Sequence, residues 1–143
     1  MTVVDASVLV DGLVVVGPAG DAARAVLRDR QVLHVPSIFT AEVTSALRAL
    51  CARQALDVTR ARAALAQLKT LRTVLYPFEP FVDRVWELRE SVTVYDGWYV
   101  ALAEFLECEL VTADRRLTRA GGVRCPVLDV ATFVPAPRTN PDP

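Results

Sequence analysis

Four acidic residues stand where carboxylates could do chemistry together. Asp5 follows the short β-branched run "TVV", and Asp114 follows the run "ELVT", so both acids are expected just beyond the end of a strand. Glu42 lies inside the helical pattern "PSIFTAEVTSALRAL", and Asp96 begins the apolar helical stretch "DGWYVALAEF". Two strands that each end in an aspartate are more than helix capping requires, so the four acids are candidates for one site.

An acidic cluster of this kind favours metal-assisted chemistry. The sequence pairs no histidine, cysteine or serine nucleophile with the four acids. Gathered carboxylates raise one another's pKa values unless a cation neutralises them. Oxygen ligands suit the hard ions Mg²⁺ and Mn²⁺, and such ions activate water for the hydrolysis of phosphate esters. The residue types therefore indicate metal-dependent phosphoryl-ester hydrolysis.

Each acid also has a purely structural explanation. Asp5 could cap the first helix, a position for which Ser7 competes, and Asp96 could cap its own helix through the amides of the first turn. Asp96 has Tyr99 three residues on, not Glu or Gln, so no reciprocal capping box is expected there. Glu42 could be a solvated surface residue, although the small side chains on its face would leave open space before it.

Short β-branched runs alternate with longer helical patterns, which predicts an α/β fold with a parallel sheet flanked by helices. In such sheets the ligand site lies outside the carboxyl ends of the strands, where the strand order reverses. Strands are expected at 2–4, 32–35, 73–76, 109–112 and 126–129. Helices are expected at 7–15, 20–30, 37–53, 57–70, 79–90, 96–107 and 114–120.

Local signals refine these elements. Ser37 is expected to cap the helix at 37–53, and Asp57 or Thr59 the helix at 57–70. Residues 1–133 are expected to form one domain, because a chain of 143 residues suits a single core. Residues 134–143 contain four prolines and almost nothing to bury, so we expect a disordered tail.

Composition excludes several classes of protein. The hydrophobic fraction is 52%, yet no run approaches the roughly 20 apolar residues that span a bilayer. No signal peptide is recognisable, so a cytoplasmic protein is expected. The three cysteines show no zinc or redox spacing and are interpreted as reduced thiols. Lys69 is the only lysine among 16 basic residues, and the arginine bias suits a nucleic-acid or acidic partner but also fits codon composition.

Four segments in this order resemble the PIN-domain ribonucleases, and in particular the VapC-type toxins of bacterial toxin–antitoxin pairs. They are "VVDASVLVD", "TAEVTSALR", "YDGWYVALAE" and "LVTADRRL". Each segment alone is weakly specific, but their joint order and spacing is strongly specific. The resemblance covers about residues 1–130 and implies a three-layer α/β/α fold with a five-stranded parallel sheet.

The resemblance also implies roles for individual residues. Asp5, Glu42, Asp96 and Asp114 match the acidic quartet that binds Mg²⁺ or Mn²⁺ and hydrolyses RNA. Ser7 and Thr112 match hydroxyl residues that support the quartet or a metal-bound water. We hypothesise that the three aspartates hold the metal, while Glu42 completes the shell and orients the attacking water. A homodimer, inhibited by a small antitoxin whose C-terminal segment occupies the acidic groove, is implied as well.

Other residues carry weaker signals. Asp11 could reach the groove of Asp5 from the first helix, although a lone acid is more often solvated or paired with arginine. His34 is expected in a strand with a satisfied ring nitrogen, and Trp98 and Tyr99 in the core or a dimer contact. Four arginines could contact the RNA backbone or simply offset the acids: Arg48, Arg115, Arg116 and Arg119.

The function predicted from these observations is a metal-dependent endoribonuclease that acts as a toxin. One alternative is a housekeeping RNA-processing nuclease of the same fold, and another is a non-catalytic module that binds RNA or a protein partner. A phosphatase is disfavoured, because no second aspartate stands two residues after Asp5 and no lysine follows a strand in a suitable place.

Overall fold

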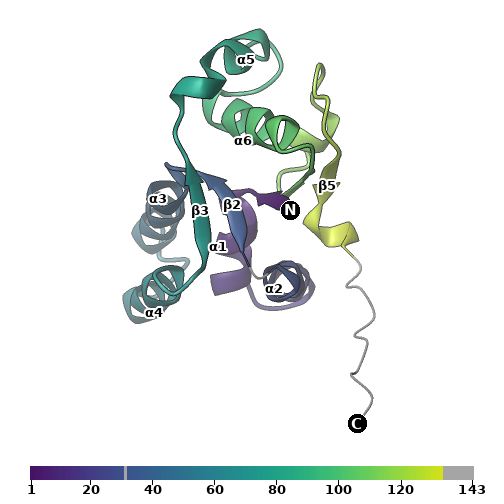
Figure 1. Ribbon diagram of the computed structural model, residues 1–143. Helices are drawn as coiled ribbons and strands as arrows, with labels where there is room; N and C mark the ends of the chain where they lie inside the picture. The colour runs from purple at the N-terminus through teal and green to yellow at the C-terminus, as the bar shows by residue number, and fades with distance from the viewer. Residues whose placement is uncertain (31, 134–143) are drawn as a thin grey trace.

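One parallel sheet of five strands forms the centre of the molecule (Figure 1). The computed structural model describes residues 1–30 and 32–133, so the tail expected at 134–143 lies outside the described residues. The strand order is β3-β2-β1-β4-β5, and every neighbouring pair is parallel, which confirms the predicted fold class. The strands are β1 (Thr2–Val4), β2 (Leu33–Pro36), β3 (Thr73–Tyr76), β4 (Glu109–Thr112) and β5 (Val127–Asp129).

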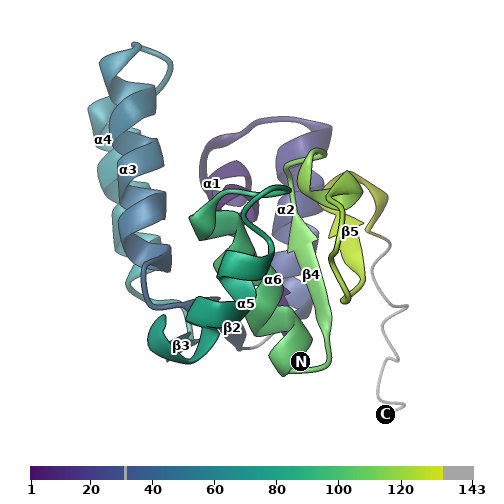
Figure 2. The ribbon, with the colours of Figure 1, turned by 90° about the horizontal axis from the view of Figure 1, so that it is seen from above.

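Helices cover both faces of the sheet. Helix α6 packs across β1, β2 and β4, with α5 outside it, while α1 to α4 lie on the other side (Figure 1). Figure 2 shows α3 and α4 side by side as a long pair. The helices are α1 (Ala6–Val14), α2 (Pro18–Asp29), α3 (Phe39–Ala52), α4 (Val58–Leu68), α5 (Val82–Glu87) and α6 (Val94–Phe105), with 3-10 turns η1 (Glu79–Phe81), η2 (Leu117–Arg119) and η3 (Val130–Thr132).

Helix α6 is buried along most of its length, because it lies between the sheet and α5. Every residue from 97 to 103 is buried, which explains the apolar character of this stretch in the sequence. A Cβ on Gly97 would lie 3.3 Å from Val85 Cγ1, so glycine lets α5 pack closely against the first turn. The core therefore fixes the start of α6, and with it the backbone of Asp96.

Three predicted helix starts are wrong by two residues. Helix α2 begins at Pro18 rather than 20, and hydrogen bonds explain the other two. The cap of α3 is Ile38, not Ser37, and its side chain makes no capping bond. The Ser37 amide instead donates to the Tyr76 carbonyl and extends the β2–β3 ladder. Helix α6 begins at Val94 rather than 96, because Thr93 is its cap. Asp57, by contrast, does cap α4, through the amides of Thr59 and Arg60.

Two predicted helices are shorter than expected. The segment expected as a helix at 114–120 is a turn followed by η2, because the Asp114 side chain accepts the Arg116 amide and closes a turn there. The segment expected at 79–90 is η1 followed by the short α5 and a loop. Among the described residues no single helix is long and apolar enough to cross a membrane; only α1 and α2 together reach that length, and they are bent by 116°.

Candidate active site

The four predicted acids line one pocket at the carboxyl edge of the sheet. β2 and β3 extend the sheet on one side of β1, and β4 and β5 on the other, so the strand order reverses where β1 and β4 end. Asp5 follows β1, and Asp114 follows β4 by one intervening residue. The pocket measures about 360 Å³, and its acidic lining consists of Asp5, Asp11, Glu42, Asp96 and Asp114. We call it the acidic pocket.

Asp5 is the most firmly held of these acids. Its side chain caps α1 by accepting from the Ser7 amide, so the capping explanation is also correct. Oxygen Oδ2 accepts from the Ser7 hydroxyl at 2.7 Å and from the Thr112 hydroxyl at 2.6 Å. Among the described residues, Oδ1 has only the long contact of 3.4 Å with the Ser7 amide. The carboxylate therefore keeps one oxygen with most of its bonding capacity free.

Ser7 and Thr112 also connect Asp5 to the end of β4. The Ser7 hydroxyl accepts from the Ala113 amide at 3.1 Å, and the Thr112 hydroxyl accepts from the Asp114 amide at 3.0 Å. Both hydroxyls thus bond to Asp5 and to the backbone that leads to Asp114. They set the relative position of two acids that lie far apart in the sequence.

Glu42 has a partner that sequence reasoning did not assign to the site. The Tyr99 hydroxyl donates to Glu42 Oε2 at 2.5 Å, although Tyr99 lies on α6 and is 1% exposed. Tyr99 was expected in the core, which is confirmed, but its hydroxyl orients a pocket carboxylate as well. Ala46, one of the small residues expected beside Glu42, lines the same pocket.

Asp96 lies in the first turn of α6 but is not its cap. The Asp96 amide donates to the Thr93 hydroxyl oxygen at 3.2 Å, and that hydroxyl donates to Asp96 Oδ2 at 2.7 Å. Thr93 therefore caps the helix, but this is not a capping box, because the carboxylate bonds to the hydroxyl of the cap residue and not to its amide. Asp96 supports the cap and lines the pocket as well.

Asp114 is paired with the nearest arginine. Arg116 donates to both carboxylate oxygens, with its Nη2 2.6 Å from Oδ2, and its amide bonds to Oδ1. Hydrogen bonds from the Arg116 side chain, the largest cause, lower the pKa of Asp114. The Arg116 side chain is 92% exposed, so this pair is accessible to water and easily exchanged.

The deeper acids carry charge without compensation. Burial raises the pKa of Asp5, an effect that its hydroxyl partners oppose and that Asp96 reinforces. Burial is also the main cause that raises the pKa values of Glu42 and Asp11. Within residues 1–30 and 32–133, no arginine or lysine forms an ion pair with Asp5, Asp11, Glu42 or Asp96. The pocket therefore favours a cation.

Two further pockets flank the acidic pocket. One, of about 460 Å³, shares Asp96 and Asp114 with it and is lined in addition by Arg89, Arg116 and the loop between α5 and α6. The other, of about 290 Å³, shares Glu42 and contains Tyr95. The acidic pocket thus shares acids with two neighbouring hollows.

Of the four arginines predicted to contact RNA, only Arg116 lines one of these hollows. Arg48, Arg115 and Arg119 are exposed, and Arg115 pairs with Asp129 at 3.2 Å. Arg89 was not predicted, since nothing in the sequence shows that the loop after α5 folds back beside Asp96. His34, as predicted, is a strand residue with a satisfied ring nitrogen, 2.8 Å from the Tyr76 hydroxyl.

The fold and the acidic pocket correspond to a known class of protein. The model of the PIN domain family matches residues 2–123 of the chain. Ribonuclease VapC9 of Mycobacterium tuberculosis is 40% identical over 127 residues, which cover 89% of this chain and 96% of that protein. The chain therefore belongs to the PIN-domain family and, within it, to the VapC ribonucleases.

Solved structures agree on the fold. The crystal structure of PAE2754 from Pyrobaculum aerophilum matches with a TM-score of 0.69 and 23% identity, over 92% of this chain and 84% of that one. Mycobacterium tuberculosis VapC20, described as a sarcin-ricin loop cleaving toxin, matches with a TM-score of 0.66 and 15% identity, over 85% of this chain and 95% of that one.

Proposed function

We propose that the acidic pocket is the catalytic centre of a divalent-metal-dependent endoribonuclease that acts as the toxin of a toxin–antitoxin pair. Membership of the VapC ribonucleases supports RNA as the substrate and hydrolysis of a phosphodiester as the reaction. The observation that carries the assignment to these residues is Asp5, which is buried, has one carboxylate oxygen largely free and, like Asp11, Glu42 and Asp96, forms no ion pair within the described residues.

The residues suit Mg²⁺ or Mn²⁺ by their chemistry. The polar side chains that line the acidic pocket all offer oxygen atoms, the type of ligand that these hard ions prefer. When bound, such an ion lowers the pKa of a water molecule and stabilises the charge that develops on the phosphate. Asp5, Asp96 and Asp114 would hold it. Glu42, fixed by the Tyr99 hydroxyl, would complete the shell and orient the attacking water.

Two of these side chains have to turn to meet an ion. In their present positions, no three His, Cys, Asp or Glu side chains of the described residues are grouped closely enough to hold a metal. Asp114 faces Arg116, and Asp96 is bonded to Thr93. The Asp114 side chain is 28% exposed, so rotation about its side-chain bonds meets no packed core. Asp5 and Glu42 already have their positions set by hydrogen bonds.

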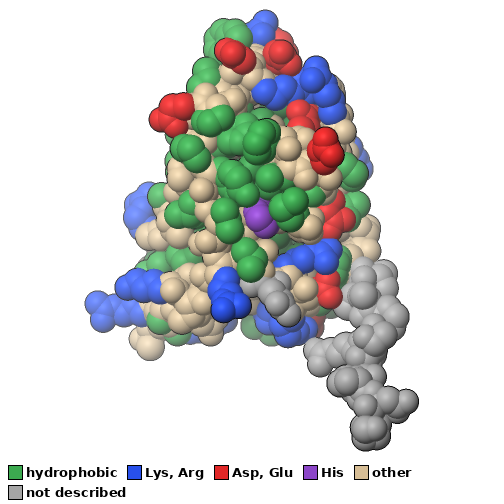
Figure 3. Space-filling view, viewed as in Figure 1, with side chains coloured by type: hydrophobic (Ala, Val, Ile, Leu, Met, Phe, Trp, Pro, Cys, Tyr) green, Lys and Arg blue, Asp and Glu red, His purple; other side chains and the backbone are tan. Residues whose placement is uncertain are grey.

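The partners follow from the same family. A small antitoxin protein would inhibit the enzyme by occupying the acidic pocket and the hollows beside it. A homodimer is supported by apolar surface: Figure 3 shows apolar side chains gathered around the histidine on the face formed by β2, β3, α5 and α6. The exposed apolar residues of these elements include Val74, Leu75, Val82 and Phe105. Faces of this kind are commonly covered by association.

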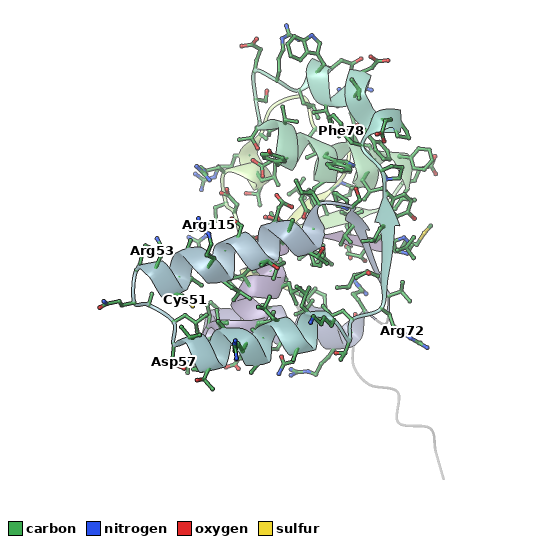
Figure 4. All side chains as sticks on the ribbon, turned by 90° about the vertical axis from the view of Figure 1, so that its left-hand side faces the viewer. Cys51, Arg53, Asp57, Arg72, Phe78 and Arg115 are labelled. Atoms are coloured by element: carbon green, nitrogen blue, oxygen red, sulfur yellow. The ribbon has the colours of Figure 1, made fainter. Side chains whose placement is uncertain are left out.

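Cleavage of an RNA pool by the antitoxin-free protein tests the proposal. We expect cleavage with Mg²⁺ or Mn²⁺, none after chelation, and a loss of at least about 100-fold in Asp5→Asn, because a carboxylate of the metal site is removed. Asp57→Asn is the matched control, since Asp57 also caps a helix but is exposed at the start of α4 (Figure 4). Undiminished cleavage by Asp5→Asn would contradict the assignment.

Thermal unfolding with and without Mn²⁺ tests the metal separately. At 100 times its dissociation constant the ion stabilises the folded state by about 2.7 kcal/mol. We expect a rise in Tm for the wild type and for Asp57→Asn but not for Asp5→Asn. Metal-dependent stabilisation without cleavage would favour the non-catalytic binding module instead.

A further inference from the structure

We infer that the hollow beside the acidic pocket, lined by Arg89 and Arg116, binds the phosphate and nucleotide next to the scissile bond. This inference rests on the proposed ribonuclease function and adds the direction in which the RNA leaves the catalytic centre. We call this hollow the arginine pocket. Its volume of about 460 Å³ lies within the range of about 300–1,000 Å³ found for sites that hold small ligands.

The arginine pocket is continuous with the acidic pocket. Asp96 and Asp114 form part of the wall of both, so a chain that leaves the acids on this side enters the arginine pocket directly. The hollow on the other side, beside Glu42, is lined by Ile38, Ala41, Glu42, Ser45 and Tyr95 and has no basic residue. Phosphate groups are bound mainly by arginine and lysine. The arginine pocket also contains Glu90, Asp96 and Asp114, so its arginine donors, and not its overall charge, favour it for the phosphate contacts.

Arg89 is held in position for such a contact. Its guanidinium lies over the ring of Trp86, 5.2 Å from the ring centre, and its Nη1 donates to the Trp86 carbonyl at 3.0 Å. Its ion pair with Glu90 is long, at 3.4 Å, and Glu90 is 83% exposed. The guanidinium therefore keeps donors for a phosphate, while Trp86 acts as a positioning residue.

Arg116 stands at the boundary of the two pockets. It bonds to Asp114 through both carboxylate oxygens, and it is otherwise surrounded by solvent. A guanidinium binds phosphate oxygens in the same two-pronged geometry. When Asp114 serves the catalytic centre, Arg116 can exchange that carboxylate for a phosphate of the RNA.

The wall between these arginines is packed against a neighbouring loop. The loop at 88–93 lies against Gly121 and Gly122, where added Cβ atoms would be 3.6 Å from Ser91 and Leu88. Arg84 stabilises this contact by donating to the Gly122 carbonyl at 2.6 Å. The pocket is thus a part of the fold and does not depend on a loop closing over the RNA.

Binding of an uncleaved RNA tests the inference. A fluorescent single-stranded RNA of roughly ten nucleotides, within the site sizes of single-strand binders, is titrated against Asp5→Asn protein at several salt concentrations. Adding Arg89→Ala is expected to weaken binding about tenfold, the size of one hydrogen-bonded charge contact. The slope of log K against log salt should become less steep by about 0.7, the value for one phosphate of a single strand.

Matched variants make the outcome specific. Arg72→Ala should leave both affinity and slope unchanged, because Arg72 is exposed before the amino end of β3, at the opposite edge of the sheet from Asp114 (Figure 4). Trp86→Ala should weaken binding less than Arg89→Ala does, with recovery in Trp86→Phe, which keeps an aromatic face. Arg116→Ala should reduce the slope as Arg89→Ala does.

Three results would overturn the inference. Suppose that Arg89→Ala binds RNA as tightly as Arg72→Ala, while cleavage by the parent protein still depends on metal and on Asp5. The ribonuclease assignment then stands, and the proposed binding of RNA in the arginine pocket is wrong. If Arg48→Ala on α3 reduces the slope and Arg89→Ala does not, the RNA runs along α3 instead. Failure of every variant to bind RNA, together with absent cleavage, would overturn both proposals.

Discussion

A carboxylate lies near each end of helix α6, and the pKa values of the two are shifted in opposite directions. Near the carboxyl end, Glu104 accepts hydrogen bonds from Arg84 Nε at 2.7 Å, from Arg84 Nη2 at 2.9 Å and from the Arg124 amide. Burial disfavours its charge, but these donors outweigh burial and hold the pKa of Glu104 below its ordinary value. Near the amino end the acidic pocket contains Asp5, whose pKa burial raises despite two hydroxyl donors.

The two acids differ in their partners and in their depth. Asp5 is buried, whereas Glu104 is half-buried. Glu104 has a guanidinium beside it, which neutralises its charge, whereas hydroxyls leave the charge of Asp5 in place. The first arrangement joins α5, α6 and the loop at 121–124. The second leaves the Asp5 carboxylate without a basic partner, which suits a cation from solution.

Removing the Arg84 guanidinium is expected to have the largest effect on this difference. Arg84→Ala leaves Glu104 without its ion pair and also removes the bond to the Gly122 carbonyl. We expect a loss of about 3 kcal/mol in the free energy of unfolding, because an orphaned, half-buried charge is costly. Urea denaturation measures it, with Arg60→Ala as the exposed control and Arg84→Lys recovering part of the loss. A loss no larger than in the control would show that Glu104 is not a structural acid.

We expect Asp5 and Glu104 to make the free energy of unfolding depend on pH in opposite directions. The folded chain keeps a proton on Asp5 to higher pH than the unfolded chain does, so stability falls as pH rises from the ordinary value of 3.8 through the raised pKa. Glu104 contributes stability that is lost as pH falls below its ordinary value of 4.5 toward the lowered pKa.

Paired variants separate these two contributions. In the presence of EDTA, Asp5→Asn should lose the decline in stability toward neutral pH, because the group with the raised pKa is removed. Glu104→Gln should instead lose the decline toward acid, and should be less stable at neutral pH. Urea denaturation between pH 3 and pH 7 would measure both slopes; the same slope in both variants would refute the comparison.

Tyr99→Phe tests the smallest effect. It removes one hydrogen bond to Glu42 and keeps the packed ring, so the free energy of unfolding should change by about 1 kcal/mol or less. Cleavage should fall severalfold, because Glu42 loses the group that fixes its direction. The cleavage rate at saturating metal distinguishes an effect on the orientation of Glu42 from an effect on folding. A variant that loses stability but cleaves at the normal rate would count against a role for Tyr99 in the site.

Much of the fold and the membership of the acidic pocket could be predicted from the sequence. β-branched runs at 2–4, 73–76 and 109–112 are strands with these same bounds, because alternation of strand and helix patterns is a local property. Asp5 and Asp114 meet because parallel strands end at one edge. That rule needs only the strand positions, so two distant acids could be placed together without any structure.

The details of the site could not be predicted, because they depend on contacts between distant residues and on side-chain rotation. Tyr99 and Glu42 are 57 residues apart, and nothing local pairs them. Arg89 reaches the site only because the segment expected as one helix ends early and its loop turns back beside Asp96. The start of α6 was misplaced because Val94 and Tyr95 are exposed apolar residues before the buried stretch, so the periodic pattern seemed to begin later.

The capping bond at Thr93 has a consequence for hydrogen exchange. Thr93 uses its oxygen to accept from the Asp96 amide and its proton to donate to the Asp96 carboxylate, so the two bonds are independent. The carboxylate can leave Thr93 for a cation while the amide stays bonded. The Asp96 amide should therefore exchange with deuterium at the same slow rate with and without Mn²⁺, and the helix would present its acid to the site without fraying.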